Sequence, residues 1–372
     1  MKYYIIAGEA SGDLHASNLM KELKLLDPEA QFRCWGGDLM QAAGGELVKH
    51  YSSLAFMGFT EVLLNLRTIL GNLKFCKEDI SAFKPDVMIL VDYPGFNLRM
   101  AKFAHHAGFK VFYYISPQVW AWKQSRVHSI RKYVDKMFVI LPFEKEYYAG
   151  FGVKVDFVGH PLHDAIAGDT ATSSEGGFRI RNRIGEQALI AMLPGSRKQE
   201  IERVLPIMLS IVPDYKKYQF IIAGVSSVGQ GFYEKFLEGN KAHIIFDETR
   251  ELLRNSEAAL VTSGTATLET AMIGIPQVVC YKGGQLSYLI ARQLIKVPFI
   301  SLVNLIAGRQ VVEELIQKKL NRKTLGQALA RILPGQAERT RILADYKELN
   351  KQLGSEKASQ KAARLMITYM HQ

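Results

Sequence analysis

Short apolar, strand-like runs alternate with helical stretches along both halves of the chain. The expected strands lie at 3–7, 87–91, 111–115, 137–141 and 155–158, and then at 189–193, 219–223, 243–246, 259–261 and 277–281. Such alternation is typical of βαβ units around a mainly parallel sheet. Because 372 residues suffice for about two domains that each bury a core, we expect two α/β domains in tandem.

The boundary between the domains is expected at 168–177, GDTATSSEGG, which is poor in large apolar residues and rich in turn formers. The first domain then covers 1–167, the linker 168–178 and the second domain 179–345. The chain from 325 onward is mostly helical by pattern, and its last helix, within 346–372, is expected to pack away from the core of the second domain.

Composition and charge exclude several classes of protein. Three cysteines, far apart and without CxxC spacing, support neither a disulfide framework nor a cysteine-based zinc site, and they fit a reducing compartment. The N-terminal apolar run reaches Glu9 too early for a secretory signal, and no run of about 18 apolar residues predicts a membrane-spanning helix. The net charge of +11 favours an anionic partner: nucleic acid, an anionic lipid surface or phosphorylated small molecules.

Two strand–turn–helix junctions in the second half carry the residues of an anion site. In PGSRKQE (194–200), Gly195 lets a ligand approach the backbone, and Arg197 with the helix N-terminus can hold a phosphate. A structural turn in which Arg197 merely pairs with Glu200 or Glu202 is an equally good interpretation.

The second junction reads TSGTATLE (262–269). Ser263, Gly264 and Thr265 supply a helix cap and close backbone approach, and Glu269 could accept bonds from ribose hydroxyls, although taken singly it is more often a solvated helix acid. Both junctions should lie at the carboxyl edge of one parallel sheet. Neither matches a P-loop, and 8–13 is not GxGxxG, which disfavours a kinase or a dinucleotide enzyme.

In the first half, Asp92 ends an apolar strand and is the candidate general base, although an Asp that caps the turn before Pro94 would look the same. The histidines show no metal-ligand spacing, so no metal is expected, and His160 is interpreted as a hinge residue.

The segment 56–75 is unusually apolar. One stripe of it, from Val62 to Leu73, is typical of a core helix. The excess residues could instead form an apolar patch that rests on a bilayer: Phe56, Met57, Phe59 and Leu64. A further segment, 116–132, places Trp120 and Trp122 beside basic residues, where a solvated basic helix is a commoner explanation than nucleic-acid binding.

Nine blocks in order along the chain resemble the lipid-A-disaccharide synthases, the inverting glycosyltransferases of Gram-negative outer-membrane biogenesis. The blocks are AGEASGD (7–13), MGFTEV (57–62), DYPGFN (92–97), SPQVWAW (116–122), LPFE (141–144), GHPL (159–162), LPGSR (193–197), SGTATLE (263–269) and NLIAGR (304–309).

This resemblance implies the GT-B architecture: two Rossmann-like domains that face a cleft, with the C-terminal residues 346–372 crossing back to the first. It implies transfer from UDP-2,3-diacylglucosamine to 2,3-diacylglucosamine 1-phosphate, to give a β-1′,6-linked disaccharide 1-phosphate and UDP. It also implies a cytoplasmic enzyme at the inner-membrane surface, monomer or homodimer, with no cofactor, no metal and no nucleic-acid partner.

By match to the family's motifs, Asp92 is the base, and the diphosphate is held by Gly195, Ser196, Arg197, Ser263, Gly264 and Thr265. Glu269 then binds the ribose, Asn304 and Arg309 lie near the donor, and the acceptor side includes Glu9, Ser11 and Gly12. The acyl chains or the membrane would contact Phe56, Met57, Phe59 and Leu64.

Two departures from the family pattern put the loop around Asn304 in doubt: Val303 stands where many relatives have Pro, and VEE (312–314) replaces a frequent Val-Pro-Glu. The rival hypotheses are another GT-B UDP-sugar transferase with a different lipid acceptor, and a non-catalytic basic protein that binds nucleic acid or membrane.

Overall fold

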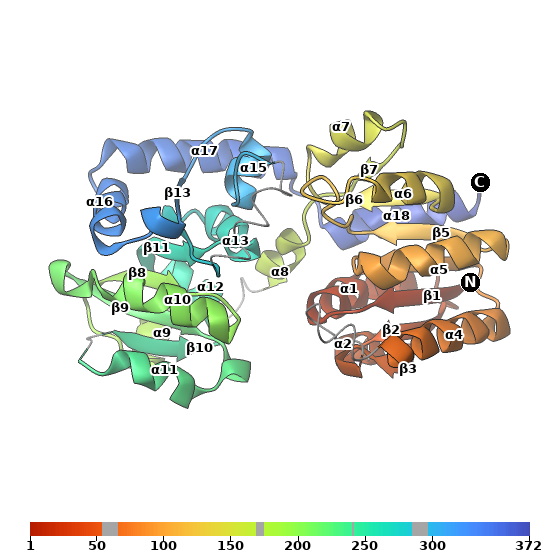
Figure 1. Ribbon diagram of the computed structural model, residues 1–372, viewed down its shortest axis with the longest axis horizontal. Coiled ribbons are helices and arrows are strands. Elements are labelled where there is room, and N and C mark those ends of the chain that lie inside the picture. Colours follow the sequence, from red (N-terminus) through yellow and green to blue (C-terminus); the bar gives the residue numbers. More distant parts are fainter. Residues whose placement is uncertain (54–65, 169–174, 240–241, 285–296) are drawn as a thin grey trace. The chain divides into compact units, whose positions relative to one another are not determined.

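The computed structural model describes residues 1–53, 66–168, 175–239, 242–284 and 297–372. The chain divides into two compact units (Figure 1): Met1–Gly168 with Leu353–Gln372 form unit 1, and Asp169–Gln352 form unit 2. The expected C-terminal boundary at 346 is therefore wrong by several residues, because α17 (Ala337–Leu353) continues to Leu353. The expected linker is also too long, because α8 ends at Gly168 and α9 begins at Glu175.

Unit 1 contains a seven-stranded parallel sheet with the strand order β3-β2-β1-β4-β5-β6-β7. The strands are β1 (Lys2–Ala7), β2 (Gln31–Gly36), β3 (Gly45–His50), β4 (Val87–Val91), β5 (Lys110–Tyr114), β6 (Lys136–Val139) and β7 (Asp156–Phe157). The order reverses between β1 and β4, and in doubly wound sheets ligands bind outside the carboxyl ends of the strands at this switch point.

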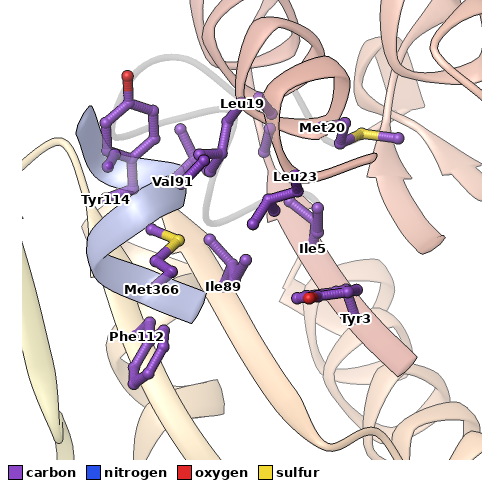
Figure 2. Close-up of a cluster of buried hydrophobic side chains, with 14 of the residues drawn as sticks. Tyr3, Ile5, Leu19, Met20, Leu23, Ile89, Val91, Phe112, Tyr114 and Met366 are labelled. Atoms are coloured by element: carbon purple, nitrogen blue, oxygen red, sulfur yellow. The ribbon is translucent and has the colours of Figure 1, made fainter. Parts of the chain in front are cut away.

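Successive residues of a strand point to opposite faces of the sheet, and both faces of this sheet are apolar. Helices therefore cover both faces. Tyr3 and Ile5 pack with α1 (Ala10–Leu26) and α18 (Ala358–Met370), whereas Tyr4 and Ile6 pack with the helices on the other face. Those helices are α4 (Leu66–Phe83), α5 (Pro94–His106), α6 (Arg126–Tyr133) and α7 (Glu144–Ala149). Figure 2 shows the first cluster, in which Met366 of α18 lies beside Phe112 and Ile89.

The C-terminal helix α18 is therefore part of the core of unit 1. Its first turn is capped by α8 (Leu162–Gly168), where the Asp164 carboxylate accepts hydrogen bonds from the backbone N–H groups of Ala358 (2.8 Å) and Ser359 (3.1 Å). The remaining short elements of unit 1 are α2 (Asp38–Ala42) and the 3-10 helix η1 (Tyr51–Ser53).

Unit 2 repeats this topology with six parallel strands in the order β10-β9-β8-β11-β12-β13. The strands are β8 (Ala188–Leu193), β9 (Tyr218–Gly224), β10 (His243–Phe246), β11 (Ser256–Thr262), β12 (Gln277–Tyr281) and β13 (Glu313–Ile316). The order reverses between β8 and β11, so the two junctions singled out in the sequence lie on either side of the switch point.

The helices of unit 2 are α9 (Glu175–Arg181), α10 (Lys198–Leu209), α11 (Gln230–Leu237), α12 (Thr249–Arg254), α13 (Thr265–Ile273), α15 (Leu302–Ala307), α16 (Arg322–Ile332) and α17. The 3-10 helices are η2 (Val212–Asp214), η3 (Ser226–Val228) and η4 (Gln317–Lys319). Leu252 and Leu253 of α12 and Phe178 of α9 join one buried cluster with β8, β9, β10 and β11.

Candidate active site

The loops that follow β1 and β4 touch at the switch point of unit 1. A Cβ on Gly8 would lie 2.3 Å from the ring of Tyr93, so a glycine is needed where the two loops meet. Gly12 also packs closely on the strand, because its Cβ would lie 3.2 Å from the Cβ of Ala7. These contacts fix the first turn of α1 against the residues around Asp92.

The main chain of Asp92 is held in an uncommon conformation. Asp92 (φ 44°) and Tyr93 (φ 47°) are both left-handed, which costs energy for residues other than glycine and is typical of functional sites. The Asp92 carbonyl oxygen accepts hydrogen bonds from Asn97 Nδ2 (2.8 Å) and from the Tyr113 hydroxyl (2.5 Å). The fully buried Asn97 also donates to the Val91 carbonyl oxygen (3.1 Å), so it fixes the turn as a unit.

The Asp92 carboxyl has the properties of a general base. Burial raises its pKa to about 6, and the negative charge of Glu9 raises it too, while a bond from the Tyr93 N–H opposes them. A pKa near the working pH is what proton abstraction needs. The alternative, in which Asp92 caps the turn before Pro94, also fits, because the Asp92 carboxyl accepts the Tyr93 N–H within that turn.

The three residues assigned to the acceptor side lie where α1 begins. Glu9 is the exposed N-cap residue, Ser11 is exposed in the first turn, and Gly12 is buried against the strand. The adjacent Asp13 is buried and accepts from the backbone N–H groups of Gly37 (2.8 Å) and Met40 (3.0 Å), so it anchors α2.

In unit 2, the turn after β8 has the geometry of an open anion site. Gly195 has a φ of +110°, and a Cβ there would lie 2.8 Å from Glu200 Oε2. Ser196 is exposed, and Arg197 is the N-cap residue of α10, whose first N–H groups have no intrahelical partner. The Arg197 side chain is 68% exposed and lies 3.7 Å from Glu200. Both interpretations of Arg197, as a partner of Glu200 and as a phosphate ligand, therefore fit the structure. A long, solvated ion pair contributes little stability, so Arg197 can leave Glu200 for a phosphate.

The turn after β11 is the second half of this site. The Ser263 hydroxyl donates to the Ile300 carbonyl oxygen (2.9 Å), Gly264 is the N-cap residue of α13, and Thr265 begins the helix. Among the described residues, no atom outside its own chain neighbours and helix lies within 4 Å of the position that a Cβ on Gly264 would occupy, so these residues leave the backbone open to a ligand.

Glu269 is not a solvated helix acid. Its side chain is 15% exposed and pairs with Arg250 Nε at 2.7 Å. The pair lines a pocket of about 460 Å³ together with Asp247, Glu248, Thr249, Glu251 and Arg254. Arg250 thus fixes the Glu269 carboxylate in the lining of this polar pocket, which is the position that binding of ligand hydroxyl groups would need.

The amide of Asn304, on α15, is fully engaged by the residues that lead into and begin β13. Its Oδ1 accepts from the N–H groups of Val311 (2.8 Å) and Val312 (3.0 Å), and its Nδ2 donates to Val312 and to Glu314 Oε1. Glu314 also accepts from the N–H groups of Ile300 and Ser301. These bonds favour a positioning role for Asn304 over direct contact with the donor, and they order the loop in spite of the two departures from the family pattern.

Arg309 forms a bidentate pair with Asp345 of α17, at 2.7 and 3.0 Å, and its side chain is 55% exposed. Hydrogen bonds from Arg309, outweighing the burial that opposes them, hold the pKa of Asp345 below its ordinary value. The guanidinium of Arg309 is thus already paired with Asp345. That Arg309 lies near the donor stays a prediction.

The four residues assigned to the membrane, Phe56, Met57, Phe59 and Leu64, lie outside the described residues. In the part of the chain that the structure covers, no helix has the length and apolarity to cross a bilayer. Nor does the same part contain a group of three or more His, Cys, Asp or Glu side chains that could hold a metal ion. His160 is buried, and its Nδ1 accepts from the Leu162 N–H (3.2 Å).

Sequence reasoning missed the partners that hold these groups. Asn97 and Tyr113 clamp Asp92, Arg250 pairs with Glu269, and Glu314 organises the loop around Asn304. Asn97 could have been found, because it lies in the DYPGFN block. The sequence around Arg250 does not predict its pairing with Glu269, because Glu269 lies on the next helix.

Two solved structures resemble the whole chain. UDP-GlcNAc 2-epimerase from Neisseria meningitidis, bound to UDP-GlcNAc, superposes with a TM-score of 0.68 at 14% identity, covering 99% of this chain and 100% of that one. The glycotransferase of kitacinnamycin gives a TM-score of 0.67 at 13% identity, covering 99% and 98%. The expected GT-B fold class, two Rossmann-like parallel-sheet units, is thereby confirmed.

The family follows from the sequence comparisons. A family model described as lipid-A-disaccharide synthetase matches residues 3–368. Curated lipid-A-disaccharide synthases are 39% identical over 371 residues in Syntrophus aciditrophicus and 38% identical over 371 residues in Geobacter metallireducens, each covering 98% of this chain and 96% of the relative. The chain therefore belongs to the lipid-A-disaccharide synthase family.

Proposed function

We propose that this chain transfers the sugar of UDP-2,3-diacylglucosamine to the 6-hydroxyl of 2,3-diacylglucosamine 1-phosphate, giving a β-1′,6-linked disaccharide 1-phosphate and UDP. Family membership over nearly the whole chain supports the disaccharide-forming step. The proposal for this chain is supported above all by Asp92. Its carboxyl has a raised pKa, and its main chain is held at the switch point of unit 1.

In the proposed reaction, the Asp92 carboxylate takes the proton of the acceptor hydroxyl as its oxygen bonds to the anomeric carbon of the donor. The bond from that carbon to the UDP oxygen breaks on the opposite face, so the configuration inverts. Because the leaving diphosphate gains negative charge, cationic and dipolar groups must stabilise it. Arg197, the N-terminus of α10 and the turn at Ser263–Thr265 are suited to this.

We further propose that the reaction needs no metal or cofactor, because Arg197 and two helix N-termini supply positive potential where the diphosphate binds. We also propose that the protein works in the cytoplasm at the inner-membrane surface, since its net charge of +11 would favour anionic lipid headgroups.

The test is release of UDP from UDP-2,3-diacylglucosamine by the purified protein in EDTA, with and without 2,3-diacylglucosamine 1-phosphate. Acceptor-dependent release with the disaccharide as product would support the substrates and metal independence together. No release from a folded sample that binds UDP would overturn the substrate pair and favour a UDP-sugar transferase with a different lipid acceptor. Restoration by Mg²⁺ alone would overturn only metal independence.

A further inference from the structure

Arg126 is a half-buried cation without an acidic partner among the residues that the structure describes. It is the first residue of α6, and burial lowers the pKa of its guanidinium. Its guanidinium carbon lies 5.5 Å from the centroid of the Trp122 ring, and no hydrogen bond or ion pair joins it to another described side chain. Since a buried charge is costly unless it is paired, such a group is suited to an anionic ligand.

The surroundings of Arg126 are positive as well. The charge of Arg99 on α5 lowers the pKa of Arg126 further, and α5 packs against α6 (Figure 1). Lys123 Nζ lies 4.6 Å from the centroid of Trp122, whose indole is 44% exposed. Two cations thus lie over one exposed aromatic ring, and the charge of Arg99 acts on one of them, which together raises the local concentration of anions.

Tyr113 connects this cationic cluster with the proposed base. Its hydroxyl donates to the Asp92 carbonyl oxygen at 2.5 Å. The same Tyr113 interacts electrostatically with both Asp92 and Arg126. Val127, the next residue of α6, packs in the same buried cluster as Tyr113, so Arg126 begins its helix on the face of the sheet from which Tyr113 holds the Asp92 turn.

We propose that Arg126, supported by Arg99 and Lys123, binds the 1-phosphate of the acceptor lipid. This inference rests on the proposed function. In a glucosamine 1-phosphate the phosphate is carried by C1 and the 6-hydroxyl by the substituent of C5, and these two carbons flank the ring oxygen. A phosphate held by the planar fork of Arg126 thus turns the 6-hydroxyl toward Asp92, while the exposed face of Trp122 offers an apolar contact to the same ligand.

The kinetic test compares two acceptors, 2,3-diacylglucosamine 1-phosphate and 2,3-diacylglucosamine without the phosphate. In Arg126→Gln we expect the preference for the phosphorylated acceptor to fall about 10- to 100-fold, through the KM of that acceptor, with the KM of the donor unchanged. Arg126→Lys should restore part of the preference. The matched control is Lys132→Gln, an exposed cation of the same helix, which should leave the preference intact.

Equal losses with both acceptors, or equal effects of the Arg126 and Lys132 changes, would overturn the assignment. A binding titration of each acceptor in detergent micelles, without donor, separates this proposal from the proposed function. If wild-type protein makes no product but its preference for the phosphorylated lipid collapses in Arg126→Gln, the phosphate site stands and the proposed reaction fails. If product forms and the preference survives in Arg126→Gln, this proposal fails alone.

The phosphate of a bulk membrane lipid is the other source of the same chemistry. Binding to phosphatidylglycerol vesicles, compared with phosphatidylcholine vesicles, distinguishes the two sources. Weaker binding of Arg126→Gln to phosphatidylglycerol with unchanged discrimination between the acceptors would assign Arg126 to the headgroups of the membrane and overturn the proposal.

Discussion

In the proposed reaction, the main chain and the side chain of Asp92 have separate tasks. Its carbonyl oxygen is held by Asn97 and Tyr113, while its carboxyl, with a pKa that burial raises to about 6, accepts the Tyr93 N–H and would take the proton of the acceptor. The strain of two successive left-handed residues is tolerated because these bonds fix the turn. A substitution that keeps the shape of the side chain therefore tests the chemistry alone.

Asp92→Asn should lower kcat by about 10²- to 10⁴-fold, because an amide cannot take the proton of the acceptor. The affinity for UDP should be nearly unchanged, since the residues assigned to the diphosphate belong to unit 2. Initial rates and calorimetric titration with UDP measure the two effects. Comparable losses in rate and in UDP affinity would contradict the assignment of Asp92 as the base.

Glu9 sets part of the pKa of Asp92. Burial is the larger cause of the raised pKa and the charge of Glu9 the smaller one, so Glu9→Gln should lower the pKa without restoring its ordinary value. The acidic limb of the profile of log kcat/KM against pH should then move below its wild-type position near pH 6. Ser11→Ala, a change two residues away without a change of charge, is the control. An acidic limb that stays in place would show that a different group titrates.

For single residues, the sequence predicts where a side chain lies in the fold better than it predicts which groups that side chain contacts. The place of Asp92 at the end of an apolar strand follows from the pattern, since parallel strands present their carboxyl ends together. The pairing of Glu269 with Arg250 does not follow, because it depends on how α12 and α13 pack. The same holds for Asn304, whose amide is consumed by backbone groups of residues 311 and 312.

Among the elements, α18 depends on a cap from a distant segment. Its N-cap residue, Lys357, makes no side-chain cap bond, and Asp164 of α8 accepts the first N–H groups instead. Asp164→Ala should lower the free energy of unfolding by about 1 kcal/mol, and Asp164→Asn by less, because Asn keeps one acceptor oxygen. Urea denaturation at constant m-value measures both. Equal stability of Asp164→Ala and wild-type protein would show that the cap contributes nothing.

The pattern predicts most strands of both sheets, including β7 and β10 at two of the sheet edges, and misses three strands that lie at or next to the other edges. The expected strands at 87–91, 243–246 and 277–281 have the observed bounds of β4, β10 and β12. The strands that it misses are β2, β3 and β13, which carry charged residues within or between apolar ones. Arg33 of β2, for example, is tolerated because Asp79 of α4 binds it at 2.6 Å. Such a tertiary partner leaves no local signal.

For unit 1 as a whole, buried titratable groups make opposed contributions to stability. Burial raises the pKa of Asp92 to about 6 and that of Glu144 to about 7. Both carboxyls bind a proton more readily when folded, so acidification from about pH 7 to 4 stabilises the fold through them. Burial lowers the pKa of His15 to about 4 and that of His160 to about 3, against an ordinary value of 6.5. Both histidines bind a proton less readily when folded, so the same acidification destabilises the fold through them.

Because these contributions share one pH window and oppose each other, wild-type stability should change little between pH 7 and 5, and a variant is needed to separate them. His15→Gln removes one destabilising group, so its stability relative to wild type should rise on acidification from pH 8 to 5 by about 1–2 kcal/mol. Urea denaturation at several pH values measures this difference, with His128→Gln, a change at an exposed residue of α6, as the control. The charge of Asp164 opposes the effect of burial on His15, and a difference that does not depend on pH would mean that this attraction cancels it. A rise confined to His15→Gln would show that the junction of α1, α8 and α18 holds His15 neutral, and that this neutral state is one of the opposed contributions that acid acts on in unit 1.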